Sequence, residues 1–208
     1  MTDESRAGFY PPPEPRIRAL GLAAIAGGIL WPVGLLNFAI TVGETCGPAG
    51  CEFSSSSAVL IALSTVLLAI GVAGLELRSR PPLGLLDLIG DMTVAVSAGL
   101  FVLASALAAP VFLGSAFLLL LIGGVLFGIE GFRGAARPRM ASALVAIGAG
   151  GMLAFAVLSG IGGPGGAGGF DQTVILAILL YSIGWVWLGV DLVLGRPVPI
   201  RQEGPARE

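Results

Sequence analysis

The chain has 208 residues, of which 55% are hydrophobic and 12% are charged, and its formal net charge is −2. Soluble domains carry about 25% charged residues, and a soluble fold of this size has too little interior to bury so much apolar surface. The composition excludes a soluble enzyme and a nucleic-acid-binding domain. It predicts an all-α polytopic membrane protein, with little mass outside the lipid bilayer.

Six apolar stretches follow one another along the chain, and each supplies the roughly 20 residues that a hydrocarbon core of about 30 Å requires. Loop-forming Gly, Pro and Arg residues separate them. The predicted spans are 17–43, 57–77, 83–109, 110–130, 140–161 and 171–194, between a proline-rich tail at 1–16 and a second tail at 195–208. Only a tight turn at Ala108-Ala109-Pro110 separates the third span from the fourth, so we expect an antiparallel hairpin there and three such hairpins in all.

The basic residues indicate how the spans are oriented. All of them are arginines, and they lie before the first span and after the second, fourth and sixth. Short loops rich in positive charge stay in the cytoplasm, which predicts six crossings with both termini cytoplasmic. The richness in Ala, Gly and Arg indicates a bacterial genome, and therefore the bacterial inner membrane. The arginines are Arg6, Arg16, Arg18, Arg78, Arg80, Arg133, Arg137, Arg139, Arg196, Arg201 and Arg207.

Metal and cofactor chemistry has few candidate ligands. Histidine is absent, which removes the usual axial ligand of b-type haem, the commonest zinc ligand and the usual general base near neutral pH. Cys46 and Cys51 alone fall short of a structural zinc site, so we expect no metal and no cofactor. Both cysteines lie in a predicted outer loop, where oxidising conditions favour a disulfide between them. A reactive redox pair is the alternative, although no activating cation lies nearby.

A short repeat ends the second, fourth and sixth spans, where glycine, an aliphatic residue and an acid follow one another. An acid beside arginines at the membrane boundary stops a helix and ties neighbouring hairpins together through ion pairs. A ring of carboxylates at an inner pore mouth is the alternative interpretation. The acids of this repeat are Glu76, Glu130 and Asp191.

Two further features of the spans predict how the helices pack. The chain contains 33 glycines, many of them inside the spans, where they favour close approach of helix backbones. Trp185 and Trp187 lie near the inner end of the sixth span, which is typical of the aromatic belt at a membrane interface.

The third span contains Asp87 and Asp91, which share a helix face because they are four residues apart. Gly84 and Ala95 continue the stripe with small residues, so we expect it to face the bundle. Counted from Pro82 at 1.5 Å per residue, the two carboxyls lie about 7 Å and about 13 Å deep. Carboxylates inside a membrane are costly, and by default they suggest function.

The surroundings of these acids predict their protonation. No basic residue lies within the apolar part of any span, and desolvation and mutual repulsion both favour the neutral acid. We therefore expect that Asp87 and Asp91 do not both carry a full charge at neutral pH. On the sixth span, a stripe from Tyr181 to Asp191 is expected to meet them, and Asp87, Asp91 and Tyr181 form the candidate proton or cation site.

Three classes of function fit these observations. The favoured hypothesis is a non-enzymatic accessory or structural membrane protein, with the lipid bilayer as its partner and a homo-oligomer or membrane complex left open. The alternative is a small proton- or cation-linked transporter that uses Asp87 and Asp91. An intramembrane aspartyl protease is disfavoured because Leu88-Ile89-Gly90-Asp91 lacks the first glycine of the Gly-x-Gly-Asp pattern. A polar cavity that reaches Asp91 would favour transport, whereas a sealed core would favour the accessory hypothesis.

Overall fold

The computed structural model describes residues 14–47, 50–51, 55–78, 85–107, 110–133, 137–158 and 172–195. Within these residues the chain forms six helices, and all six are long and apolar enough to cross a membrane. This result confirms the predicted all-α, six-span fold. The helices are α1 (Pro15–Thr45), α2 (Ser55–Arg78), α3 (Leu85–Leu107), α4 (Pro110–Arg133), α5 (Arg139–Leu158) and α6 (Gln172–Leu194), and two short strands, β1 (Cys46–Gly47) and β2 (Gly50–Cys51), follow α1.

The helix boundaries follow from local chemistry. An apolar segment in lipid must satisfy its backbone hydrogen bonds internally, which favours a helix throughout each span. Pro110 begins α4, a position where the missing N–H of proline removes no helical hydrogen bond. Gly195 ends α6 with a φ of 63°, and its N–H donates to the Asp191 carbonyl at 3.0 Å. The predicted tails, apart from residues 14–16 and Gly195, and the turn at 108–109 lie outside the described residues.

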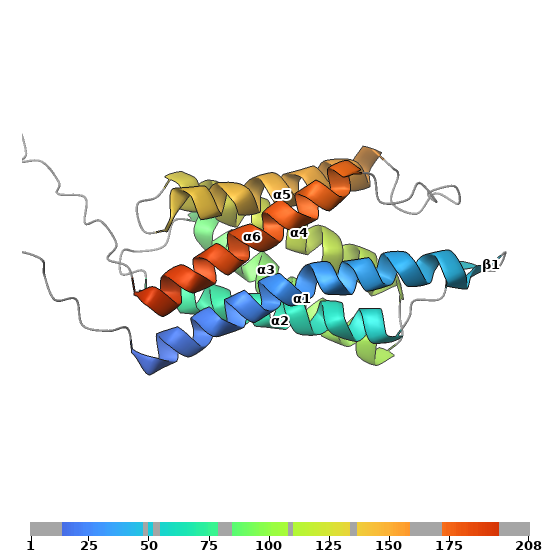
Figure 1. The fold of residues 1–208 in the computed structure, drawn as a ribbon, viewed down its shortest axis with the longest axis horizontal. Helices are drawn as coiled ribbons and strands as arrows, with labels where there is room; N and C mark the ends of the chain where they lie inside the picture. Colours follow the sequence, from blue (N-terminus) through green and yellow to red (C-terminus); the bar gives the residue numbers. More distant parts are fainter. Residues whose placement is uncertain are drawn as a thin grey trace, which may run out of the picture.

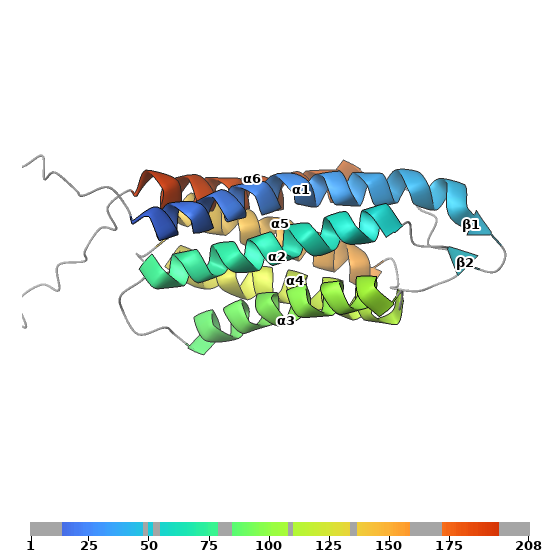
Figure 2. The ribbon, with the colours of Figure 1, turned by 90° about the horizontal axis from the view of Figure 1, so that it is seen from below.

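The six helices form a closed ring. Each helix packs against the next one in the sequence, and α6 returns to pack against α1, as Figures 1 and 2 show from two directions. The contacts of α4 with α5 and of α6 with α1 are nearly as extensive as those within the predicted hairpins, whereas α2 and α3 contact each other less. The three predicted hairpins therefore do not form separate units. They merge into one bundle.

Glycines bring the helix backbones together in this ring, as the sequence predicts. A Cβ built on Gly189 of α6 would lie 2.6 Å from the Gly21 carbonyl oxygen of α1. A Cβ built on Gly128 of α4 would lie 2.6 Å from the backbone nitrogen of Ala146 in α5. A side chain at either position would push the two helices apart, so glycine is what permits this spacing.

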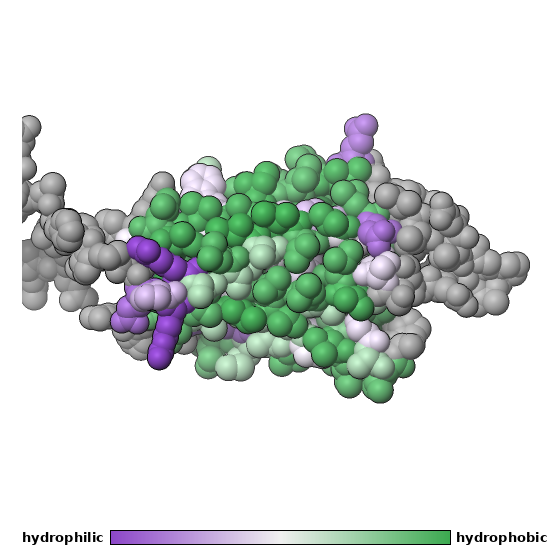
Figure 3. Space-filling view, turned by 60° about the horizontal axis from the view of Figure 1, so that its bottom comes forward, coloured by the Kyte–Doolittle hydropathy of each residue, from purple (hydrophilic) through white to green (hydrophobic). Residues whose placement is uncertain are grey.

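The two ends of the bundle differ in polarity. We call the end that holds Glu14 and Gly195 the terminal end, and the opposite end, where α1 leads toward α2, the loop end (Figure 1). Hydrophilic residues gather mostly at the terminal end, and hydrophobic residues cover the middle of the bundle (Figure 3). The outer surface of the middle is therefore suited to lipid.

Candidate functional site

Large aromatic side chains fill the centre of the ring. The Trp31 ring stacks on Phe117 with centroids 6.0 Å apart, meets Phe101 edge-on at 6.3 Å and lies 6.0 Å from Tyr181. Toward the terminal end, Tyr181 contacts Trp185, whose ring stacks on Phe127 at 5.0 Å. We call these six residues, Phe101, Phe117, Trp31, Tyr181, Trp185 and Phe127, the aromatic column. They come from α1, α3, α4 and α6, so the column ties four helices together.

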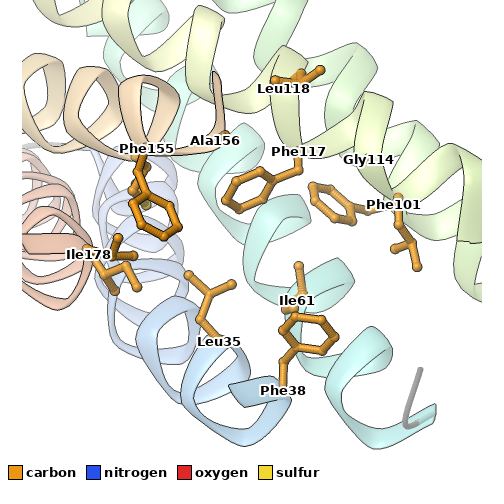
Figure 4. Close-up of a pocket in the computed structure, with 13 residues that line it drawn as sticks. Leu35, Phe38, Ile61, Phe101, Gly114, Phe117, Leu118, Phe155, Ala156 and Ile178 are labelled. Carbon is orange, nitrogen blue, oxygen red and sulfur yellow. The ribbon is translucent and has the colours of Figure 1, made fainter. Parts of the chain in front are cut away.

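A cavity of about 440 Å³ lies beside the column in the loop-end half of the ring. All six helices contribute to its wall, and every side chain of the wall is apolar. Figure 4 shows the rings of Phe117 and Phe155, from α4 and α5, pointing into the same space. The wall residues are Leu35, Phe38, Ile61, Phe101, Leu113, Gly114, Phe117, Leu118, Met152, Phe155, Ala156, Val174 and Ile178.

Asp91 lies far from this cavity. It is buried in α3, and ten residues at 1.5 Å per residue place it about 15 Å from Phe101 along the helix axis. The predicted inward stripe does not continue past it, because Ala95 is exposed and the buried face follows Val94, Ser97 and Phe101 instead. The side chain of Asp87 lies outside the described residues.

Tyr181 belongs to the aromatic column. The predicted stripe from Tyr181 to Asp191 is buried, so α6 does turn that face inward. However, α6 packs mainly against α1 and α5, whereas α3 packs against α2 and α4. The two stripes therefore lie on helices that are not neighbours in the ring. The described contacts of the Tyr181 ring are with Trp31, Trp185 and Gly124.

Two acids of the repeat form ion pairs between helices. Arg78 Nη1 at the end of α2 lies 2.9 Å from Asp191 Oδ2 on α6, and it also donates to the Asp191 carbonyl. Arg137, just before α5, pairs with Glu76 of α2. The third acid, Glu130, makes no ion pair among the described residues.

Arg137 covers the end of the aromatic column that lies nearest to the terminal end of the bundle. Its side chain is 3% exposed, and its guanidinium carbon lies 4.1 Å from the centroid of the Phe127 ring. A cation over an aromatic face is attracted by the ring quadrupole. In the sequence, Arg137 is only one of the arginines that predict the orientation, because no local pattern indicates that its side chain folds inward.

The expectation that both tryptophans of α6 lie in an interfacial belt is half wrong. Trp185 is fully buried in the column, while Trp187 is 40% exposed. Residues two apart on a helix point about 200° away from each other, so the two side chains do not share one environment.

The two cysteines face each other along the backbone. β1 and β2 pair antiparallel, with Cys46 opposite Cys51 and Gly47 opposite Gly50. The side chains of both cysteines lie outside the described residues, so the disulfide stays a prediction. Elsewhere, the described residues contain no group of three or more Cys, Asp or Glu side chains placed to hold a metal ion.

Comparison with known proteins does not assign the chain to a family. No protein-family model, no curated protein and no solved structure matches the chain. The cavity, which sequence reasoning missed, is therefore the feature from which a function is best argued. Its wall residues come from six spans, and nothing in their spacing along the chain shows that they surround one space.

Proposed function

We propose that this membrane protein is non-enzymatic and that it binds the apolar part of another membrane molecule in the cavity at its loop end. One observation carries the proposal: a space of about 440 Å³ is walled by residues from all six helices, and among the described residues of that wall no side chain is polar. Pockets for small molecules typically measure about 300–1,000 Å³. Apolar cavities of this kind stay dry and take up apolar molecules.

Filling this space is physically favourable. The atoms that line a void lack partners on one side, so they lose dispersion contacts that an occupant restores. Within the described part of the chain, the wall offers no acid, base or nucleophile that could act on a bound molecule, which supports binding rather than catalysis. Phe101 and Phe117 belong both to the wall and to the aromatic column, which supports a site packed against the column rather than a passage through the ring.

Trp31 makes this binding measurable. It contacts two wall residues, Phe101 and Phe117, and is itself fully buried. A protein with Trp185→Phe and Trp187→Phe retains Trp31 as its only tryptophan. Titration with 1-bromododecane in detergent should quench Trp31 emission with saturation, because bromine quenches indole over short distances and Trp31 packs directly behind the wall residues Phe101 and Phe117.

Two leucine substitutions test whether the probe occupies this cavity. Gly114 lines it, and a Cβ built there meets no atom within 4 Å, so Gly114→Leu should fill space and weaken the quenching. Gly99 of α3 also meets no atom within 4 Å but lies outside the wall, so Gly99→Leu should leave the quenching unchanged. Equal quenching in both variants would overturn the proposed function.

A second candidate, a small proton- or cation-linked transporter, is favoured by the burial of Asp91 inside a membrane span. Acids at such positions commonly serve ion and proton pathways. This hypothesis predicts pH-dependent flux in liposomes that Asp91→Asn abolishes while the protein still folds. Flux that survives in Asp91→Asn, or no flux in the native protein, would contradict it.

We further propose that both termini lie in the cytoplasm of a bacterial cell and that the protein resides in the inner membrane. The arginine distribution supports this orientation, and the described arginines Arg16, Arg78 and Arg133 all belong to helix ends on the terminal side of the bundle.

A further inference from the structure

The residues of the cavity wall differ in exposure from one side of the cavity to the other. Of its seven residues on α4 and α5, six are partly exposed and only Met152 is buried. Of its six residues on the other four helices, only Phe38 is partly exposed, and the remaining five are at most 5% exposed. Apart from Phe38, the wall is therefore buried on the α1, α2, α3 and α6 sides, and it is most exposed on α4 and α5 near the loop end.

The glycine contacts between α4 and α5 explain why the wall is more exposed on this side. A Cβ built on any of three glycines of α4 would come within 3.0 Å of α5, and all three lie in the second half of α4, toward the terminal end. They are Gly124 against Ala149, Gly128 against Ala146 and Gly131 against Ser142. Gly114, one to two turns after the start of α4, has nothing within 4 Å. The two helices are thus tightly joined at the terminal end and lack such contacts beside the cavity.

The more exposed side of the wall faces the hydrocarbon of the bilayer. The wall residues from Leu113 to Leu118 and from Met152 to Ala156 belong to the membrane-spanning parts of α4 and α5. Gly114 is four residues from the start of α4, which is about 6 Å along the helix, so this side begins close to one membrane interface. A molecule that entered the cavity from this side would come from lipid and not from water.

From this arrangement we infer that the occupant is a single acyl chain of a bilayer lipid, inserted from the side between α4 and α5. This inference rests on the proposed function. The wall residues that the structure describes include no hydrogen-bonding or charged side chain, so burying a headgroup among them would leave polar atoms unpaired. A hydrocarbon chain has none. The headgroup stays at the interface near the start of α4 while one chain fills the space.

The test places the Trp31-only protein in nanodiscs of phosphatidylglycerol with brominated acyl chains and, separately, in nanodiscs of the unbrominated lipid. Trp31 lies inside the ring with no exposed surface, so lipid around the outside is screened from it by the helices. We expect at least about a twofold loss of Trp31 emission in the brominated lipid. A site is half filled when the free ligand concentration equals Kd, and the lipid of the nanodisc should exceed that point, so at least half of the protein should be quenched.

Matched variants identify the source of the quenching. Gly114→Leu, and Ala156→Leu on the α5 part of the same wall, should each restore the emission, while Gly99→Leu on the outer surface should leave it quenched. Quenching by 1-bromododecane without quenching by the brominated lipid would overturn the acyl-chain inference alone. Quenching by neither would overturn the proposed function as well.

Discussion

Replacing one glycine between α5 and α6 should destabilise the ring by a predictable amount. A Cβ on Gly148 would overlap the backbone of Tyr181 and lie 2.6 Å from the Ala177 carbonyl oxygen. Ordinary van der Waals contact begins at 3.4 Å, so Gly148→Ala must move α5 away from α6 by at least about 0.8 Å. The opposing atoms are backbone, so no flexible side chain can yield in their place.

The matched control lies on the same helix. Gly150→Ala places a Cβ whose nearest neighbour is Val125 Cγ2 at 3.8 Å, an ordinary contact. Both variants share the gain of about 0.5–1 kcal/mol that alanine brings to a helix interior, so their difference isolates the steric term. Overpacking typically costs about 1–3 kcal/mol, and each kcal/mol shifts Tm by about 2–4 °C in a chain of this length.

Thermal unfolding in detergent, followed by circular dichroism, measures the difference. We expect Gly150→Ala to unfold at or slightly above the temperature of the native protein and Gly148→Ala to unfold several degrees below it. Equal unfolding temperatures for the two variants would refute the close contact between α5 and α6.

Three further outcomes are expected. Cys46 and Cys51 should form a disulfide, so protein prepared without reductant should show no alkylated thiol by mass spectrometry; two alkylated thiols would refute this. A reporter that is active only in the cytoplasm should work at the C-terminus and fail when inserted in 162–169. Activity of the reporter in 162–169 would contradict the six-span orientation. Arg137→Met should lower Tm more than Arg133→Met, because Arg137 is buried over Phe127 and paired with an acid, whereas Arg133 is exposed. Losing one partner of a buried ion pair leaves an uncompensated charge. Equal losses would show that the Arg137 contacts add nothing to stability.

Helix positions could be predicted because they depend on local sequence. The fourth span begins at Pro110 both in the sequence prediction and in the structure, and the sixth span differs by one residue at its start. A stretch of some twenty apolar residues has only one favourable state in lipid. Neighbouring spans do not alter that requirement.

The direction in which a side chain points within the ring was harder to predict. Asp91 is buried, as its stripe of small residues predicts, but Ala95 on the same stripe is exposed. All faces of these helices are apolar, so hydropathy does not distinguish a lipid-facing side from a buried side. Trp185 was misjudged for the same reason, and the inward position of Arg137 could not be predicted, since each is buried only through contacts with other parts of the chain.

By itself, the sequence determined that the chain is a six-span helical membrane protein, because apolar length and the placement of loop residues act within each segment. Only the tertiary structure decided that the helices close into a ring, that an aromatic column fills one part of it and that an apolar cavity remains beside Phe117. These features arise from the distances between helix axes, and those distances depend on pairs such as Gly148 and Ala177, which are distant in sequence and come together only when the ring closes.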